Sequence, residues 1–418
     1  MRRDSSLNAL RINSDRLNRR LAQLAGIGGL VGGGVCRLAL TDEDRQGRDL
    51  VCGWMRELGL EVTIDQIGNV VGLRPGRLAT DPVMTGSHID TVATGGVYDG
   101  NLGVLAGLEV IECLNEADIE TLHPVAVAFF TNEEGARFAP DMMGSGVHQG
   151  SMRLEEMLAV TGIDDASVGD ELRRIGYAGE VAVGTSRARC FVELHIEQGP
   201  VLEREAIQIG AVTGVQGISW TEYTLRGVSN HAGTTPMNYR HDPGYVAARL
   251  AVEARQLAEE IGHHQVATVG QVKLLPNLVN VIPRQATLTV DLRNMDELLL
   301  KRAEELLDER LMTIAASEGV EVSQRRLARF EPVHFSAEMT QRVEEIAGRL
   351  GLTCRRMPSG AGHDAQMFAP NCPTSMIFVP SQGGISHNIG EYTPPDQLAD
   401  GANVLLQMIL RCATSEES

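Results

Sequence analysis

Apolar residues in the first half of the chain form two kinds of segment, which follow one another in turn. Segments with apolar residues every three or four positions predict helices, and short continuous apolar runs predict buried strands. Helices are expected at 41–59 and 101–116, and strands at 61–73, 82–88, 124–135 and 190–199. Because strands and helices alternate, the pattern favours an α/β sheet that is covered by helices on both faces.

The pattern changes at about Gly214. Exposed alternating strands and two helices follow in the order β-α-β-β-α-β, which is typical of a ferredoxin-like α+β domain. The strands are expected at 219–230, 264–275, 285–294 and 320–330, and the helices at 242–262 and 295–319. Helices at 336–351 and 395–412 and a strand at 374–380 then resume the first pattern. We therefore interpret 214–331 as a domain inserted between 1–213 and 332–418.

Polar residues follow three of the apolar strands in the first half of the chain. His88 ends one strand, Glu133 and Glu134 end another, and His195 and Gln198 end the third. Open α/β sheets bind their ligands in the crevice outside the carboxyl ends of the strands. These three groups are therefore expected to meet in one crevice.

Composition and charge narrow the class of partner. The formal net charge is −18 at pH 7, and an acidic surface repels nucleic acid phosphates and anionic lipids. The seven cysteines include no CxxC motif, which argues against a cysteine zinc site or a disulfide framework and favours a reducing compartment. There is no signal-peptide pattern and no apolar run long enough for a membrane span. We expect a cytoplasmic protein with no membrane or nucleic acid partner.

Five imidazole and carboxylate side chains are candidate metal ligands, because each follows an apolar strand or lies in a glycine-rich loop. They are His88, Asp99, Glu134, His195 and His387. Such ligands suit zinc, manganese, cobalt or nickel, whereas calcium and magnesium prefer oxygen. Five ligands exceed the need of one catalytic zinc and suit two metal ions bridged by a carboxylate, for which Asp99 is the natural choice. From spacing alone, a chance collection of dispersed polar residues explains the set equally well.

Two further acids have predicted roles beside these ligands. Asp90, two residues after His88, is expected to accept a hydrogen bond from the second ring nitrogen of that imidazole. Glu133 and Glu134 are neighbours in an extended segment, so their side chains point in different directions. One can bind metal while the other takes a proton from water, and we assign Glu133 as the general base and later the acid to the leaving nitrogen. Taken alone, a His-x-Asp or Glu-Glu pair is more often a solvated surface feature.

Seven stretches carry a resemblance to a known family over residues 10–410, nearly the whole chain. In order they read GSHIDTVATGGVYDGNLGVLAGLEV, FTNEEGARFAPDMMGS, ELHIEQGPVLE, GVSNHAGTTPM, LVNVIPRQATLTVDLRN, PSGAGHDAQ and GISHNIGEY. Together they resemble the M20-type metal amidohydrolases of the hydantoinase/carbamoylase branch. The resemblance implies a di-metal catalytic domain, with a central mixed sheet flanked by helices, and an inserted lid domain that forms a homodimer. It also implies that the five candidate ligands hold two divalent metal ions, with Asp99 as the bridge and Glu133 as the base.

The resemblance assigns substrate recognition mainly to the inserted domain. His231 resembles a histidine that reaches the active site of the neighbouring subunit and stabilises the oxyanion there. Asn280 and Arg293 resemble residues that hold a substrate carboxylate, and the planar fork of arginine suits that task. Without the resemblance, His231 is a loop residue in a turn and Arg293 a surface ion-pair partner. Further substrate-binding candidates are Gln198 and the backbone near Gly360 and Ala361.

We interpret the chain as a metal-dependent amidohydrolase that cleaves the carbamoyl C–N bond of N-carbamoyl-L-amino acids, a class of small ureido acids. The products are the amino acid, carbon dioxide and ammonia. Allantoate amidohydrolase and β-ureidopropionase are the alternatives. The stretch FTNEEGARFAPDMMGS resembles the carbamoylases and β-ureidopropionases more than it resembles the allantoate amidohydrolases. An N-acyl amino acid hydrolase or a peptidase is a more distant alternative, and no acid that would hold a free amine is evident. A non-catalytic relative would have lost a ligand or Glu133, and all six residues are present.

Overall fold

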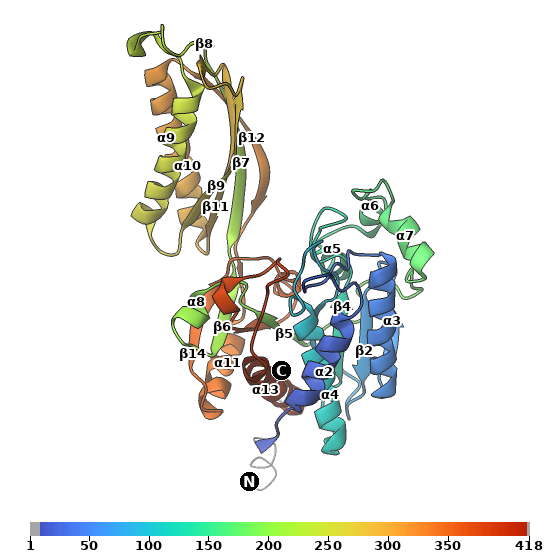
Figure 1. The fold of residues 1–418 in the computed structure, drawn as a ribbon. Coiled ribbons are helices and arrows are strands. Elements are labelled where there is room, and N and C mark those ends of the chain that lie inside the picture. The colour runs from blue at the N-terminus through green and yellow to red at the C-terminus, as the bar shows by residue number, and fades with distance from the viewer. Residues whose placement is uncertain (1–8, 416–418) are drawn as a thin grey trace. The chain divides into compact units, whose positions relative to one another are not determined.

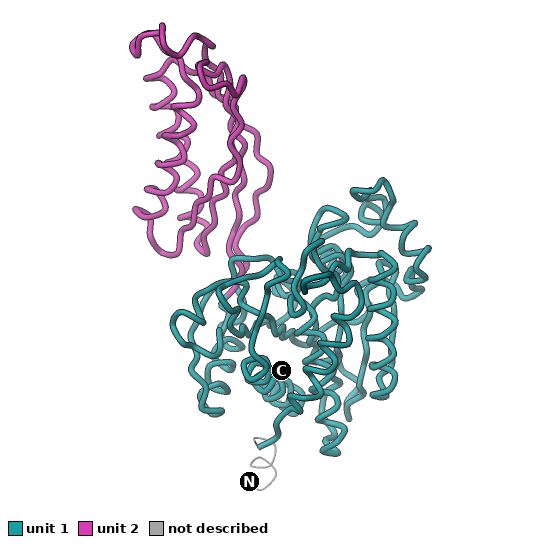
Figure 2. Tube along the Cα trace, viewed as in Figure 1, with its two compact units in different colours: residues 1–213, 334–418 teal, residues 214–333 magenta. Residues whose placement is uncertain are grey.

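The computed structural model describes residues 9–415, which form two compact units (Figures 1 and 2). Unit 1 comprises the described residues of Met1–Thr213 and His334–Ser418, and unit 2 comprises Gly214–Val333. Each unit has its own hydrophobic core. Unit 2 therefore interrupts unit 1 in sequence without sharing its core.

Unit 1 is built around a nine-stranded mixed sheet in the order β1-β2-β4-β3-β5-β15-β6-β13, with β14 beside β6. The strands are β1 Glu61–Ile64, β2 Val70–Arg74, β3 Val83–His88, β4 Val125–Phe130, β5 Cys190–Ile196, β6 Ile209–Val215, β13 Val333–His334, β14 Cys354–Ser359 and β15 Thr374–Val379. The central strands β4, β3, β5 and β15 pair in parallel, whereas β2 and β6 pair antiparallel with them. Every residue of the four central strands is buried, as expected for parallel strands with both faces covered.

Helices cover both faces of this sheet (Figure 1). The helices of unit 1 among the described residues are α2 Ser14–Ala25, α3 Asp42–Glu57, α4 Asn101–Glu116, α5 Met143–His148, α6 Leu154–Leu158, α7 Val168–Ile175, α8 Val201–Arg204, α11 Ala337–Arg349, α12 Asp364–Phe368 and α13 Pro395–Thr414. Those that pack against its strands are α3, α4, α5, α11, α12 and α13. Leu194 of β5 lies against Gly401 of α13, whereas Phe191 stacks on Phe368 of α12 at a ring-centroid distance of 4.0 Å. Residues three apart in a strand point to opposite faces, so α13 and α12 cover opposite faces. This confirms the predicted mixed sheet flanked by helices.

Residues 61–73 form a hairpin instead of the single strand that the pattern predicted. β1 and β2 pair antiparallel. The Asp65 carboxylate accepts hydrogen bonds from the backbone N–H groups of Ile67 (3.1 Å) and Asn69 (2.9 Å), and Gly68 has a φ of 83°. An aspartate that binds the backbone ahead of it and a glycine in the left-handed region together reverse the chain. The prediction overlooked this turn because apolar residues flank it on both sides.

Unit 2 has a four-stranded antiparallel sheet in the order β12-β7-β11-β9. Its elements are β7 Gly217–Arg226, β8 Asn230–His231, η1 Met237–Tyr239, α9 Pro243–Ile261, β9 Val266–Leu275, β10 Val281–Ile282, β11 Gln285–Asn294, α10 Glu297–Glu318 and β12 Glu321–Phe330. Apart from the short β8–β10 pair, this is the predicted β-α-β-β-α-β order. Alternate residues of β11 are buried against α9 and α10, so the sheet has one covered face.

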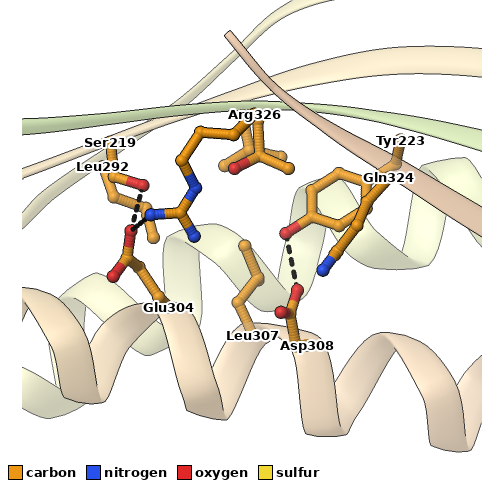
Figure 3. A pocket seen from close by; sticks show the side chains of 10 residues that line it. Ser219, Tyr223, Leu292, Glu304, Leu307, Asp308, Gln324 and Arg326 are labelled. Atoms are coloured by element: carbon orange, nitrogen blue, oxygen red, sulfur yellow. Dashed lines mark hydrogen bonds and ion pairs between the residues drawn. The ribbon is translucent and has the colours of Figure 1, made fainter. Parts of the chain in front are cut away.

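A small cavity of about 50 Å³ lies between this sheet and α10 (Figure 3). Glu304 of α10 accepts hydrogen bonds from Ser219 and from Arg326, the latter at 2.8 Å. Tyr223 donates to Asp308 at 2.8 Å. Five of the polar side chains around this cavity therefore have partners among themselves, and we interpret the cavity as part of the packing of unit 2.

Among residues 9–415, no helix is both long enough and apolar enough to cross a membrane. The longest apolar helix of unit 1, α13, is buried along most of its length against the sheet. Its apolar residues are thus accounted for by the core of unit 1.

The Asp65 turn gives a test of this part of the fold. Asp65→Ala removes the acceptor for two backbone N–H groups in a buried turn, so we expect the free energy of unfolding to fall by about 1–3 kcal/mol. Urea unfolding followed by circular dichroism measures the change. Asp81→Ala, at an exposed aspartate before β3, is the matched control and should leave the midpoint unchanged. Equal midpoints for the two variants would contradict the role of the Asp65 carboxylate.

Candidate metal centre

The predicted ligands of unit 1 lie at one edge of its central sheet. His88 is the last residue of β3, His195 is the penultimate residue of β5, and Glu134 follows β4 by four residues. Asp99 lies in the loop before α4, and His387 lies in the loop before α13. Because β3, β4 and β5 are parallel, their carboxyl ends share this edge.

These five side chains form two groups that share Asp99. In the first group, Asp99 Oδ1 lies 3.5 Å from His88 Nε2 and 3.1 Å from His195 Nε2. In the second, His387 Nε2 lies 3.5 Å from Asp99 Oδ2 and 3.2 Å from Glu134 Oε2. Each carboxylate oxygen of Asp99 therefore faces a different group. This arrangement fits a carboxylate that bridges two cations.

The charges of the site also fit bound cations. Burial would raise the pKa of Asp99, but hydrogen bonds with His195, His387 and His88 hold it well below its usual range. Asp99 and Glu134 in turn raise the pKa of His387 to about 10. The histidines thus serve as the counter-charges of buried acids. Divalent ions with nitrogen and oxygen ligands would take over that role and leave the imidazoles neutral.

Asp90 contacts His88 through a different group than predicted. His88 Nδ1 lies 2.9 Å from the backbone carbonyl oxygen of Asp90, whereas the Asp90 carboxylate is 3.9 Å away. That carboxylate instead accepts hydrogen bonds from the backbone N–H groups of Glu133 (3.2 Å) and Glu134 (3.3 Å). The backbone carbonyl oxygen of Asp90 is therefore the nearer partner of the His88 ring. Asp90 therefore orients His88 through its backbone and positions the two glutamates through its side chain.

Glu391 is a site residue that the sequence interpretation missed. Its carboxylate accepts hydrogen bonds from the backbone N–H groups of Tyr98 (3.1 Å) and Asp99 (3.2 Å), and from the Ser386 hydroxyl at 2.9 Å. Burial and the Asp99 charge raise the pKa of Glu391 to about 7. The residue lies in the stretch GISHNIGEY, four positions after His387, and this proximity was the available signal.

Glycines allow the Asp99 loop to approach His88 closely. Gly100 has a φ of 65°, and a Cβ at this position would lie 2.4 Å from the His88 ring. A Cβ on Gly96 would lie 1.9 Å from the Glu391 carboxylate. Side chains at these two positions are therefore incompatible with the observed contacts.

Glu133 and Glu134 point to different partners. Glu133 Oε2 lies 3.3 Å from His88 Nε2, while Glu134 faces His387. Burial raises the pKa of Glu133, and nearby acids raise it further, although the charge of His88 opposes them. A buried carboxyl group with a raised pKa is suited to accept a proton at one step and to return it at another.

A pocket of about 110 Å³ opens beside both ligand groups. Gln198 and Ala361, two predicted substrate-binding residues, line it; Gly360 is the neighbour of Ala361. Gln198 Nε2 donates to Asp99 Oδ2 at 2.8 Å. The buried ring of His363 also lines the pocket and lies edge-on to His195 at a centroid distance of 4.5 Å.

Several non-glycine residues in or beside the site have left-handed backbone conformations. Asn132, Gln198 and His387 have φ values of 56°, 58° and 53°. Such conformations cost free energy and persist only where the surrounding contacts impose them. Two of these residues are predicted functional residues, and the third directly precedes Glu133. Similar conformations also occur away from the site, and at these positions they accompany side chains that lie in or beside it.

His231, Asn280 and Arg293 belong to unit 2. His231 and Asn280 are close together, because β8 pairs with β10 and the Ala232 N–H donates to the Asn280 carbonyl oxygen at 3.0 Å. Arg293 lies at the opposite end of β11 from β10, where it pairs with Asp291 (2.9 Å) and lies over the Trp220 ring. Unit 2 thus does not bring these three residues together within itself.

Comparison with known proteins identifies the family. The sequence model of "Peptidase family M20/M25/M40" matches residues 84–411, which is more than half of the chain. The chain belongs to this family. An M20 relative from Rhizobium meliloti named N-carbamoyl-L-amino-acid amidohydrolase is 42% identical over 96% of this chain and 97% of its own length. The allantoate amidohydrolase of Escherichia coli is 36% identical over 95% of this chain and 97% of its own length.

A solved structure is also very similar to this chain. It is a hydantoinase/carbamoylase family amidase from Burkholderia multivorans, with 45% sequence identity and a TM-score of 0.96. The match covers 97% of this chain and 99% of that one. The similarity therefore extends over both units of the M20 chain.

Gly100 gives a test of the metal centre in this M20 chain. Gly100→Ala adds a Cβ against the His88 ring at a position with positive φ, so the ring or the Asp99 loop must shift and the contact between them is disturbed. We expect zinc affinity to fall roughly 10- to 100-fold, as when the support of a ligand is lost. Equilibrium dialysis with metal analysis measures this. Gly53→Ala in α3, where nothing lies within 4 Å of the added Cβ, is the control; similar zinc affinity in both variants would argue against the site.

Proposed function

We propose that this M20 enzyme hydrolyses N-carbamoyl-L-amino acids to the amino acid, carbon dioxide and ammonia. The observation that carries the proposal is the pair of ligand groups sharing Asp99, with the Glu133 carboxylate beside them in one pocket. The Rhizobium meliloti relative, which bears the name of this activity, is similar over nearly the whole chain. The same arrangement makes the enzyme a metal-dependent hydrolase of linear, non-peptide C–N bonds.

Two divalent metal ions per subunit fit the donor set, and zinc, manganese, cobalt or nickel suit its chemistry. His88 and His195 would hold one ion, Glu134 and His387 would hold the other, and Asp99 would contact both. When bound, such ions supply Lewis acidity toward the ureido carbonyl and make water easier to deprotonate. Asp90 and Glu391 hold the ligands in place through the hydrogen bonds described above.

Glu133 would move the protons of the reaction. It takes a proton from the attacking water as the water oxygen bonds to the ureido carbon. It then donates this proton to the leaving nitrogen as the C–N bond breaks. The carbamic acid that results then breaks its remaining C–N bond, so that overall one ureido acid and one water give one amino acid, one carbon dioxide and one ammonia. The raised pKa of Glu133 suits both transfers.

Unit 2 would serve as a lid that also forms a homodimer. Its edge strand β9 is exposed along most of its length and offers unpaired backbone groups to a second copy. His231 would stabilise the oxyanion in the neighbouring subunit, with Asn280 beside it, and Arg293 would hold the substrate carboxylate. The separation of Arg293 from the other two along unit 2 supports a site that draws on two chains.

Allantoate amidohydrolase is the second candidate function, because the Escherichia coli relative of that name is also similar over nearly the full chain. A β-ureidopropionase would use the same residues to release a β-amino acid, and an N-acyl amino acid hydrolase or a peptidase is a more distant candidate.

The seven cysteines are all free thiols, which fits the reducing cytoplasm as the place of action.

A substrate panel tests the function directly. Purified enzyme loaded with manganese, cobalt or zinc should release ammonia fastest from N-carbamoyl-L-α-amino acids. The panel also contains the D-isomers, N-carbamoyl-β-alanine, allantoate and an N-acetyl amino acid. Glu133→Gln protein, which lacks the base but keeps the ligands, is the control and should lose at least about 100-fold in kcat. Preference for allantoate would favour the second candidate, and no turnover of any ureido acid would refute both.

Subunit mixing tests the role of His231. Glu133→Ala and His231→Ala proteins should each be nearly inactive. A heterodimer of the two retains one site with an intact base and an intact partner histidine, so partial activity should return. Exchange is verified by native mass spectrometry with differently tagged chains. Absence of any recovery after verified exchange would refute action in the neighbouring subunit.

A further inference from the structure

The loop that follows β4 doubles back on itself and brings Asp141 to the pocket. The Met142 N–H donates to the Glu133 carbonyl oxygen at 2.8 Å. The side-chain amide of Asn132 donates to two carbonyl oxygens within the loop, at 2.8 and 3.1 Å. These bonds close the loop, and Asp141 joins Glu133 in the pocket lining.

Close packing keeps Asp141 in this position. Gly135 has a φ of 63°, and a Cβ there would lie 2.8 Å from the backbone nitrogen of Asp141. Met142 has a φ of 50°, which is costly for a non-glycine residue, and its buried side chain packs against Gly362. Asp141 is therefore held between a close contact with Gly135 and the strained backbone of Met142.

Asp141 is the one carboxylate lining the pocket that the proposed chemistry does not use. Asp99 and Glu134 belong to the ligand groups, and Glu133 is the proposed base. Asp141 belongs to none of the ligand groups found in residues 9–415. Its side chain forms neither an ion pair nor a hydrogen bond with any other residue in that range, and the residue is exposed. The pocket also holds a neutral acceptor, the buried Oε1 of Gln198, which accepts no hydrogen bond from the described part of the chain.

We propose that Asp141 is a specificity-determining residue that accepts hydrogen bonds from the terminal NH₂ of the ureido group. The inference rests on the proposed function, because it names the part of the substrate that this carboxylate recognises. A ureido group carries an NH₂ where an N-acetyl group carries a methyl group of similar size. An ionised acceptor gains hydrogen bonds from the former and is left unpaired by the latter. Asp141 thus selects ureido acids over N-acyl amino acids.

Ligand binding tests this separately from turnover. The proteins are metal-loaded Glu133→Gln, which cannot consume the ligand, and the same protein with Asp141→Ala. Calorimetry gives the Kd of each for N-carbamoyl-L-methionine and for N-acetyl-L-methionine. We expect Asp141→Ala to weaken binding of the carbamoyl ligand about tenfold or more, the usual effect of losing a hydrogen bond to a charged group. Binding of the acetyl ligand should change by less than about twofold.

Further variants separate this role from others. Asp141→Asn keeps the size and one acceptor oxygen, so it should restore part of the carbamoyl affinity that Asp141→Ala loses. Glu155→Ala, at an exposed acid of α6 outside the pocket, is the control and should change neither Kd. Equal weakening of both ligands, no change in either, or loss of bound metal from Asp141→Ala would overturn the proposal. If the wild-type enzyme releases no ammonia from any ureido acid, the proposed function fails, while the difference between the two ligands still decides the role of Asp141.

Discussion

The Asp99 carboxylate holds the candidate metal centre together. Its two oxygens face the imidazoles of two ligand groups, Gln198 donates to the second oxygen at 2.8 Å, and the Ser386 hydroxyl lies 2.9 Å from that oxygen. Removing a buried carboxylate with so many partners would leave several polar groups unsatisfied at once. Two neighbouring residues support the position of Asp99. Gly100 allows the Asp99 loop to approach the His88 ring closely, and Glu391 accepts a hydrogen bond from the backbone N–H of Asp99.

Strands and loops contribute differently to this centre. The ligands on β3 and β5 are positioned by a buried parallel sheet, which imposes their spacing without local strain. The loop residues Asn132, Gln198 and His387 reach their positions only with a left-handed backbone. Strand ends thus position His88 and His195, whereas His387 reaches the site from a loop with a left-handed backbone.

The sequence predicted the central strands and the long helices well, because their apolar patterns are strong and uninterrupted. Helix 101–116 was predicted with its observed bounds. The hairpin at 61–73 was predicted wrongly as one strand, since the turn depends on a contact of the Asp65 side chain that periodicity does not reveal. Helix α2 and strand β6 were not predicted. For the site, residue chemistry at strand ends indicated candidate ligands that the structure brings together. It did not show that the backbone carbonyl of Asp90, and not its side chain, contacts His88, and it did not reveal Glu391. Such details depend on how separate loops meet in three dimensions.

The interruption of unit 1 by unit 2 has a consequence for protein synthesis. Four of the candidate ligands are translated before unit 2, whereas His387 is translated after it. The sheet has the same division, because β15 pairs with β5 across the whole insertion. A nascent chain therefore holds the acids of the site without their last imidazole while unit 2 emerges from the ribosome and folds around its own core. Assembly of the candidate metal centre becomes a late step of biosynthesis, and a translation product truncated after unit 2 would lack both β15 and the last candidate ligand, His387.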